Sequence, residues 1–86
     1  MKYKIAISKN AQKSLAKIPK VFQQKIISSI KELSFNPHPQ NSKKLTNRLA
    51  WRIRINNYRV IYEIDEEILT ISIIVISHRR NVYQKC

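Results

Sequence analysis

The stretch WRIRINNYRVIY, residues 51–62, constrains the fold most strongly, because apolar and polar residues alternate on both sides of a short polar break. Successive side chains of an extended strand point to opposite faces, so Arg52 and Arg54 share one face. Ile53 and Ile55 share the other. The two arginines then lie roughly 7 Å apart along the strand. The pattern predicts a β-hairpin with one apolar face and one arginine-bearing face.

The hairpin is expected to continue into a third strand. We place the strands at 49–55, 58–64 and 68–76. The last strand loses its polar alternation between Ile73 and Ile76. This run predicts a strand that is buried on both faces and central in the sheet.

Both expected turns lack glycine, as does the whole chain. The turns are Asn56-Asn57 and the acidic segment 65–67. A left-handed backbone conformation is unfavourable for residues with a Cβ atom, and Asn and Asp tolerate it best. We therefore expect Asn or Asp at the left-handed turn positions.

The N-terminal half predicts one strand and two helices. Residues 2–8 alternate as a half-buried strand does, and Ser8 or Asn10 is a suitable helix N-cap. Apolar residues then recur at spacings of three and four, which indicates an amphipathic helix. Pro19 suits the first turn of a second helix, and the segment FNPHP, residues 35–39, ends it.

The remaining segments complete the expected architecture. Residues 40–48 are predicted to be a polar, basic connection, and residues 81–85 a short C-terminal turn or helix. The order of strand, two helices and three strands predicts an α+β domain over residues 1–86. The helices are expected to pack on one face of an antiparallel sheet of about four strands.

The charge balance points to a polyanionic partner. Seventeen Lys and Arg against five Asp and Glu give a net charge of +12, and four of the acids lie between residues 63 and 67. Such a field favours encounter with polyanions and gives salt-dependent affinity for nucleic acid. RNA, DNA and an acidic protein segment all fit this charge.

The compartment is expected to be the cytoplasm. Cys86 is the one cysteine, so a disulfide framework within the chain is excluded. No apolar segment typical of a secretion signal follows Met1, and no apolar run is long enough to span a bilayer.

Several kinds of catalytic site are excluded by composition. One cysteine and two histidines cannot form a zinc site of conventional spacing, and a chain without glycine has no glycine-rich phosphate loop. We expect no metal and no cofactor. What remains is chemistry by cations on a phosphate, because guanidinium groups bind phosphate oxygens and stabilise the extra charge of a pentavalent transition state.

RNA supplies its own nucleophile, the 2′-hydroxyl, so the protein need only position the phosphate and move protons. Tyr83 is the candidate for proton transfer, since positive charge nearby, such as Arg79, favours its phenolate form. His78 and Glu63 are alternative acid–base groups. Glu63 could instead pair with Arg59 on the same strand face.

Two motifs give the chain a family resemblance. WRIRINNYRVIY and the later IVISHRRNVY, in this order and spacing, resemble toxins of the RelE/ParE superfamily of bacterial toxin–antitoxin modules. The resemblance covers nearly the whole chain. For the RelE branch it implies cleavage of messenger RNA in the ribosomal A site, with a 2′,3′-cyclic phosphate product. It also implies two partners, a cognate antitoxin with an acidic, partly disordered segment and the ribosome with its bound messenger RNA and ribosomal RNA.

The resemblance also assigns site residues. The chain has arginines at 52 and 54 where the best-known member has lysines, and its closing motif is shorter, which leaves the roles of Arg79 and Arg80 open. The catalytic set implied is Arg52, Arg54, Arg59, Arg79 and Tyr83. Beside this set, we take the basic residues Lys43, Lys44, Arg48 and Arg80 as candidates for RNA binding.

Other readings of the same residues stay open. The ParE branch of the fold inhibits DNA gyrase without cutting nucleic acid, and an inactive relative would only bind RNA. Arg52 and Arg54 could be solubilising charges, and Tyr83 an ordinary surface residue. Trp51 could pack in the core or at the sheet edge, or stack on a base.

Overall fold

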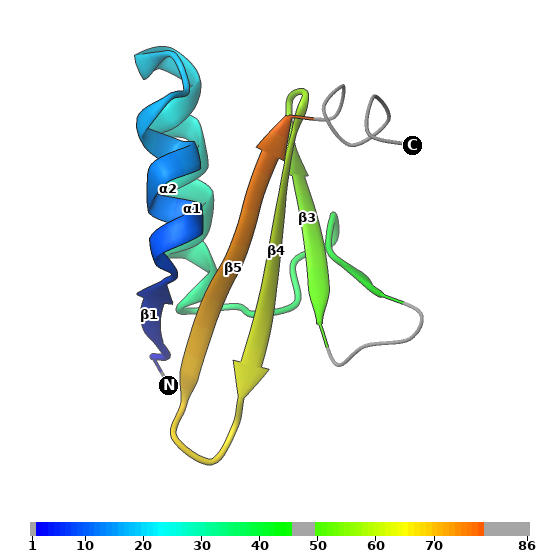
Figure 1. Cartoon of the computed structure of the whole chain (residues 1–86). Helices are drawn as coiled ribbons and strands as arrows, with labels where there is room; N and C mark the ends of the chain where they lie inside the picture. Colours follow the sequence, from blue (N-terminus) through cyan, green and yellow to red (C-terminus); the bar gives the residue numbers. More distant parts are fainter. Residues whose placement is uncertain (1, 46–49, 79–86) are drawn as a thin grey trace.

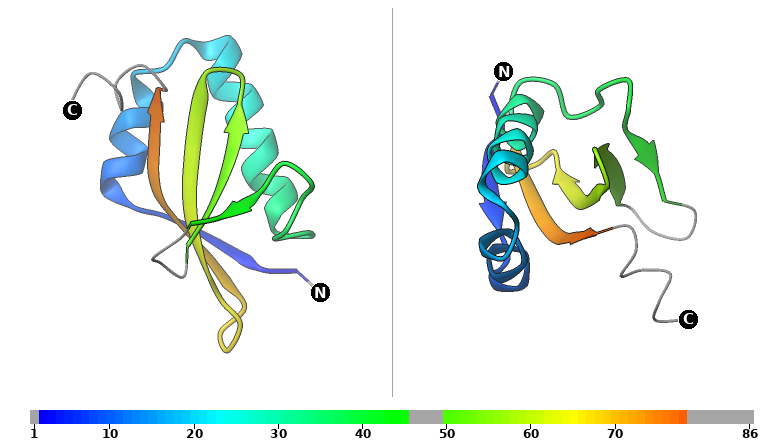
Figure 2. Two further views of the ribbon diagram at one scale, coloured as in Figure 1. Left: turned by 90° about the vertical axis from the view of Figure 1, so that its right-hand side faces the viewer. Right: turned by 90° about the horizontal axis from the view of Figure 1, so that it is seen from above.

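The structure is a computed structural model that describes residues 2–45 and 50–78. Both helices lie on the same side of the sheet (Figure 1; Figure 2 shows this from above). This confirms the predicted α+β architecture. The elements in chain order are strand β1 Lys4–Ile7, helix α1 Lys9–Ala16, helix α2 Lys20–Leu33, and strands β2 Lys43–Lys44, β3 Trp51–Ile55, β4 Tyr58–Asp65 and β5 Thr70–His78.

The sheet has five strands in the order β1-β5-β4-β3-β2, and it is mixed rather than wholly antiparallel. β1 runs parallel to β5, while the other pairs are antiparallel. The extra strand is β2, which falls in the predicted connection 40–48. It has only two residues, too few for an alternating pattern to reveal it.

The core lies between the helices and the inner face of the sheet. α1 packs on β5 and α2 packs on β3. The helix spacings of three and four residues bring the apolar side chains to one face of each helix, and neither helix is long enough to be stable without that burial. The buried helix residues are Ala11, Ile26, Ile30 and Leu33.

Ser8 joins α1 to the sheet. Its Oγ accepts a hydrogen bond from the Ala11 N–H at 3.0 Å and donates one to the Ile74 carbonyl at 2.9 Å. The serine is therefore the N-cap of α1, whereas Asn10 lies inside the helix. The cap satisfies an otherwise unpaired N–H and fixes the start of α1 against β5.

A β-bulge explains the apolar run of β5. Ile61 pairs with Val75 but the next residue, Tyr62, pairs with Ile73, so Ile74 has no partner in the ladder. Ile73 and Ile76 are fully buried, while the two residues between them are half-buried. β5 is an interior strand, as expected, but the prediction that it is buried on both faces is wrong. The extra residue shifts the alternation by one position.

The two turns differ from each other in how they use left-handed residues. Asn56 has φ 55°, as expected for the first turn, but the second turn places Leu69 at φ 48°. The expectation of Asn or Asp there is wrong. Asp65 instead accepts a hydrogen bond from the Glu67 N–H at 3.0 Å, which extends the turn, and β5 begins only at Thr70.

Tyr62 anchors the segment that follows α2. Its ring is fully buried and its hydroxyl donates a 2.8 Å hydrogen bond to the Pro37 carbonyl. Burial raises the pKa of Tyr62, although Ser42 lowers it in part. Beside it Trp51 packs against the core and meets His38 edge-on at 4.4 Å between ring centroids. The core-packing reading of this tryptophan is therefore confirmed.

Some predictions concern residues outside the described part of the chain. They are Arg48, Arg79, Arg80, Tyr83 and the short turn or helix at 81–85. No helix in the described part of the chain is long and apolar enough to cross a membrane.

Replacing Tyr62 by Phe is expected to lower the free energy of unfolding by about 1 kcal/mol, because the Pro37 carbonyl loses its donor. Tyr3→Phe is the matched control. It removes an exposed hydrogen bond to Glu66 and should leave the unfolding midpoint close to that of wild type. Urea unfolding of both variants measures this, and equal losses would contradict the anchoring role of Tyr62.

The same tyrosine predicts a pH dependence. Its raised pKa means that the folded state favours the neutral phenol, so this contribution is complete below the ordinary tyrosine pKa of about 10. The contribution is lost as the pH rises through the raised folded-state pKa. The stability difference between wild type and Tyr62→Phe should therefore shrink in alkaline solution, and a difference that grew there would contradict the assignment.

Leu69→Asn is expected to stabilise the protein by up to about 1 kcal/mol, since asparagine tolerates the left-handed conformation better than leucine. Ile68→Asn is the control, because the neighbouring Ile68 is exposed and does not have a positive φ. Thermal unfolding compares the two. A loss of stability at position 69 would show that packing of the leucine outweighs its backbone strain.

Candidate functional site

The open face of the sheet carries the predicted arginines. On β3, Ile53 and Ile55 are buried toward the helices, so Arg52 and Arg54 point to the opposite face. On β4 the buried residues are Val60 and Tyr62, which places Arg59 on the open face as well. The predicted orientation of the hairpin is therefore confirmed.

Strand pairing brings these side chains into rows. Arg54 lies directly opposite Arg59, so their Cβ atoms are about 5 Å apart. Arg59 in turn lies opposite Ser77. A second row places Lys43 opposite Arg52. We call Lys43, Arg52, Arg54 and Arg59 the basic face.

Lys44 is not part of the basic face. It pairs with Trp51, whose ring packs against the core, so it lies on the other side of the sheet edge. The sequence assigned Lys43 and Lys44 the same role because it gave no sign of β2. The structure separates them, since neighbouring residues of a strand point in opposite directions.

The basic face lacks compensating acids near Arg54 and Arg59. In the described residues neither arginine forms an ion pair, and the Nε of Arg59 is buried without a hydrogen-bond partner. A buried donor left without an acceptor costs roughly 1–3 kcal/mol. Two like charges directly opposite on a sheet are also unfavourable. Together these features indicate a site arranged for an anion.

The acidic turn lies far from this site. Arg59 is near the start of β4 and Asp65 ends the strand, which separates them by about 20 Å. Figure 1 shows the β3–β4 turn and the β4–β5 turn at opposite ends of the sheet. The exposed Glu63 is about 13 Å from Arg59 along the same strand.

His78 lies on the other side of the sheet from the arginines. It pairs with Tyr58, and the two rings meet edge-on at 5.0 Å between centroids. A cavity that they share is also lined by Ser14, Lys17 and Ile18, from the end of α1. This position separates His78 from the basic face, so proton transfer to a phosphate held there would need another group.

The structure brings together three of the five predicted catalytic residues, Arg52, Arg54 and Arg59. Arg79 and Tyr83, with the RNA-binding candidates Arg48 and Arg80, lie outside the described residues. The described chain leaves β5 at His78, at the end of the sheet that holds the Arg54–Arg59 pair.

Sequence reasoning missed the neighbours of the arginines on the open face. Ser77 adjoins Arg59, while Ile61 and Val75 extend the row that begins at Lys43 and Arg52. These two apolar residues are half-buried and form an apolar surface beside the basic face. The β4–β5 register would have identified them, but the bulge hides that register in the sequence.

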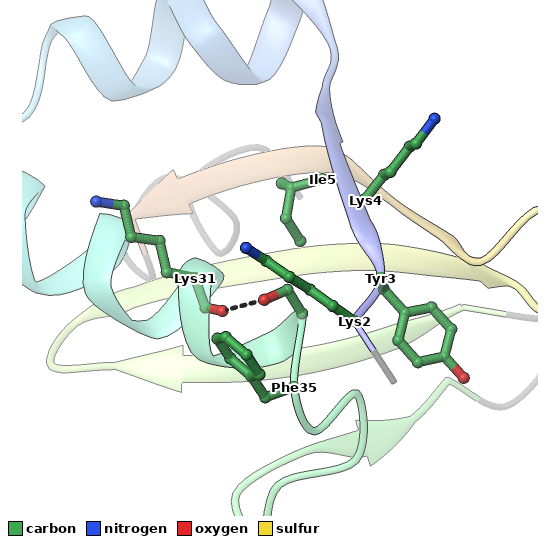
Figure 3. Close-up of a pocket in the computed structure, with 7 residues that line it drawn as sticks. Lys2, Tyr3, Lys4, Ile5, Lys31 and Phe35 are labelled. Atoms are coloured by element: carbon green, nitrogen blue, oxygen red, sulfur yellow. Dashed lines mark hydrogen bonds between the residues drawn. The ribbon is translucent and has the colours of Figure 1, made fainter.

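A second concave surface lies beside the edge strand β1 (Figure 3). It encloses about 600 Å³, and its Phe35 ring is 70% exposed. The ammonium group of Lys2 lies 5.6 Å from the centroid of that ring. The surface is mainly apolar with lysines around it, and its lining is Lys2, Tyr3, Lys4, Ile5, Lys31, Ser34 and Phe35.

The chemistry open to the basic face is binding of phosphate. Guanidinium groups remain protonated, donate several hydrogen bonds and match phosphate oxygens in geometry. Three of them on one sheet face can hold a phosphodiester and stabilise additional negative charge on it. Among the described residues no group of three or more His, Cys, Asp or Glu could hold a metal ion.

Comparison with known protein families gives one match over most of the chain. The family described as "ParE toxin of type II toxin-antitoxin system, parDE" matches residues 5–83. A curated relative, Toxin RelG of Mycobacterium tuberculosis (strain ATCC 25618 / H37Rv), is 28% identical over 91 residues. That alignment covers 99% of this chain and 100% of the relative.

Solved structures agree in fold. The toxin–antitoxin complex RelBE2 from Mycobacterium tuberculosis contains a chain with a TM-score of 0.80 and 26% identity, covering 92% of this chain and 100% of that one. A chain of the archaeal RelE–RelB complex from Pyrococcus horikoshii OT3 has a TM-score of 0.83 and 27% identity, and the match covers 92% of this chain and 97% of that one. The predicted RelE-like fold is thereby confirmed.

Arg54→Gln is expected to raise the free energy of unfolding by roughly 0.2–1 kcal/mol at low salt, because it removes the repulsion from Arg59. The gain should shrink at about 1 M salt, where charges are screened beyond about 3 Å. Lys44→Gln is the control, since Lys44 lies opposite Trp51 rather than a cation. Equal effects of both substitutions in urea unfolding would contradict a specific repulsion.

Proposed function

The chain belongs to the RelE/ParE superfamily of toxins of type II toxin–antitoxin systems, and from this premise we propose that it is a ribosome-dependent endoribonuclease. It cleaves messenger RNA in the ribosomal A site, inhibits translation in the cytoplasm, and is neutralised by a cognate antitoxin. The observation that carries the proposal is the Arg54–Arg59 pair, with the buried Nε of Arg59 lacking an acceptor.

The proposed reaction uses the nucleophile of the substrate. The 2′-oxygen attacks the phosphorus, the bond from phosphorus to the 5′-oxygen breaks, and the products are a 2′,3′-cyclic phosphate and a free 5′-hydroxyl. Arg52, Arg54 and Arg59 hold the non-bridging oxygens and stabilise the added charge of the transition state. Arg52 and Arg54 lie on β3 and Arg59 lies on β4, and the pairing of these two strands fixes their relative positions. The arginines therefore need no rearrangement at the moment of reaction.

Two proton transfers complete this reaction. Tyr83, as its phenolate, is proposed to accept the proton of the 2′-hydroxyl, and Arg79 to favour that phenolate form. The departing 5′-oxygen takes up a proton from water. Lys43, with Arg48 and Arg80, is proposed to bind the RNA on either side of the cleaved bond. Arg52 and Arg54 are poor proton donors because guanidinium groups do not deprotonate, so we assign them charge stabilisation alone.

The antitoxin is proposed to be a protein with acidic and apolar residues. Of the two similar solved structures, one is a toxin–antitoxin complex and the other is a complex of RelE with RelB. The surface beside β1 supports a comparable partner here, because its apolar centre and surrounding lysines complement an acidic amphipathic segment (Figure 3).

A second candidate is inhibition of DNA gyrase, favoured by the match to the family of ParE toxins. A protein that only binds gyrase has no need of an arginine with a buried, unpaired donor on an open sheet face. A supercoiling assay with purified gyrase distinguishes the two functions. An inactive RNA-binding relative is the third reading, and it predicts binding without cuts.

Ribosomes programmed with a defined messenger RNA test the proposal by primer extension. Wild type should produce cuts within translated codons. Arg59→Gln should lower the cleavage rate about 10²–10³-fold through lost charge stabilisation, and Tyr83→Phe about 10²–10⁴-fold through lost proton transfer. Lys25→Gln, an exposed change on α2, is the control for net charge and should cut like wild type.

Absence of cuts by the wild-type protein would refute the nuclease. Growth arrest on expression without cuts, together with loss of supercoiling activity, would support the gyrase reading instead. Normal cleavage by Tyr83→Phe would leave the nuclease in place and remove the tyrosine from its mechanism.

A further inference from the structure

The cavity shared by Tyr58 and His78 has no role in the chemistry of the basic face. It encloses about 410 Å³, within the usual range for small-ligand sites, and opens at the end of the sheet on the helix side. Ser14 lies in the last turn of α1, Lys17 is the C-cap of that helix, and Ile18 follows directly. Figure 1 shows the end of α1, the tip of β5 and the β3–β4 turn at the same end of the molecule.

Three polar groups in this cavity are free to bind a ligand. Within the described residues, the side chains of Ser14, Lys17 and Tyr58 have no hydrogen-bond or ion-pair partner. None of the described residues that line the cavity is acidic. A hydroxyl, an ammonium and a phenol on one wall form a set of donors suited to an anion such as a phosphate.

The same cavity offers aromatic surface. The Tyr58 ring contacts Phe22, with the ring centroids 5.7 Å apart, and His78, which meets it edge-on with the centroids 5.0 Å apart and the ring planes at 89°. Both Tyr58 and His78 are partly exposed. Partly exposed aromatic rings beside cationic groups are the usual means of binding unpaired bases, which stack on them.

The cavity lies close to the basic face in sequence and in space. Tyr58 directly precedes Arg59, and neighbouring residues of a strand point to opposite faces. The two sites are therefore separated by little more than the thickness of the sheet with its side chains, about 10 Å. A single-stranded RNA that passes over this end of the sheet can reach both.

We propose that the cavity formed by Ser14, Lys17, Ile18, Tyr58 and His78 binds one unpaired nucleotide of RNA next to the cleaved bond. The base lies against Tyr58 and His78, and its phosphate accepts hydrogen bonds from Lys17 and Ser14. The cavity thereby sets a base preference for cutting. The role in cutting rests on the proposed nuclease function, whereas binding of a nucleotide can be measured without it.

The first test is NMR titration of the full chain with each of the four nucleoside 5′-monophosphates, and with ribose 5-phosphate and inorganic phosphate for comparison. Saturable amide shifts are expected at Ser14, Lys17, Tyr58 and His78, with nucleotides binding about tenfold more tightly than ribose 5-phosphate through base stacking. Absence of shifts there would overturn the proposal. Equal affinity for inorganic phosphate would also overturn it, since that describes an anion site only.

Lys17→Gln is expected to weaken nucleotide binding about tenfold, the effect of losing one charge-assisted hydrogen bond. Lys13→Gln is the matched control, because Lys13 lies one turn earlier on α1 and does not line the cavity. Equal weakening by both would show a general charge effect and overturn the assignment. Circular dichroism verifies that both variants fold.

Cut-site mapping across many transcripts tests the role in cleavage. Lys17→Gln should change the base preference beside the cut, while Lys13→Gln keeps the wild-type preference. Nucleotide binding by a protein that cuts no RNA would refute the nuclease and leave the binding site established. Cleavage with unchanged preference in Lys17→Gln would refute the role of the cavity in cutting.

Discussion

Burial of alternate residues in the β3–β4 hairpin is the constraint on which the rest of the molecule depends. Ile53, Ile55, Val60 and Tyr62 face the helices, and their burial holds the hairpin in one register. A slip of one residue would move the arginines into the core and the isoleucines into water. The same apolar contacts that stabilise the domain therefore position Arg54 opposite Arg59, so the site and the core are specified together.

The bulge at Ile74 divides β5 into two segments. Residues 70–73, before the bulge, pair with β1 on one side and with the end of β4 on the other, and residues 75–78, after it, pair with the start of β4. Ser8 binds the bulged carbonyl while capping α1, so the irregular residue is also where the helical layer is attached. A bulge increases local twist, and here it lies between the acidic turn and the end of the sheet that carries the basic face.

The features predictable from sequence were those with a repeating pattern. Alternation located the arginines on one face, helical spacing located both helices, and a short polar pair located the Asn56 turn. The features that escaped prediction depend on pairing: the two-residue β2, the parallel partner of β5, and the bulge. Leu69 shows the limit of conformational preferences, because the turn places a leucine in the left-handed backbone conformation, which is unfavourable for leucine. Lys43 and Lys44 show a similar limit at the site. Only the pairing of β2 with β3 shows that Lys43 lies on the face of Arg52 and that Lys44 lies on the opposite face.

The position of the acidic turn gives the long β4–β5 hairpin and its neighbour β3 charges of opposite sign at their two ends. Asp65, Glu66 and Glu67 lie at one end of the long β4–β5 hairpin, and the Arg54–Arg59 pair lies at the other. In the field of a polyanion such a molecule experiences a torque as well as an attraction. This separation of charge favours approach with the arginine end leading, which reduces collisions in orientations that cannot lead to binding.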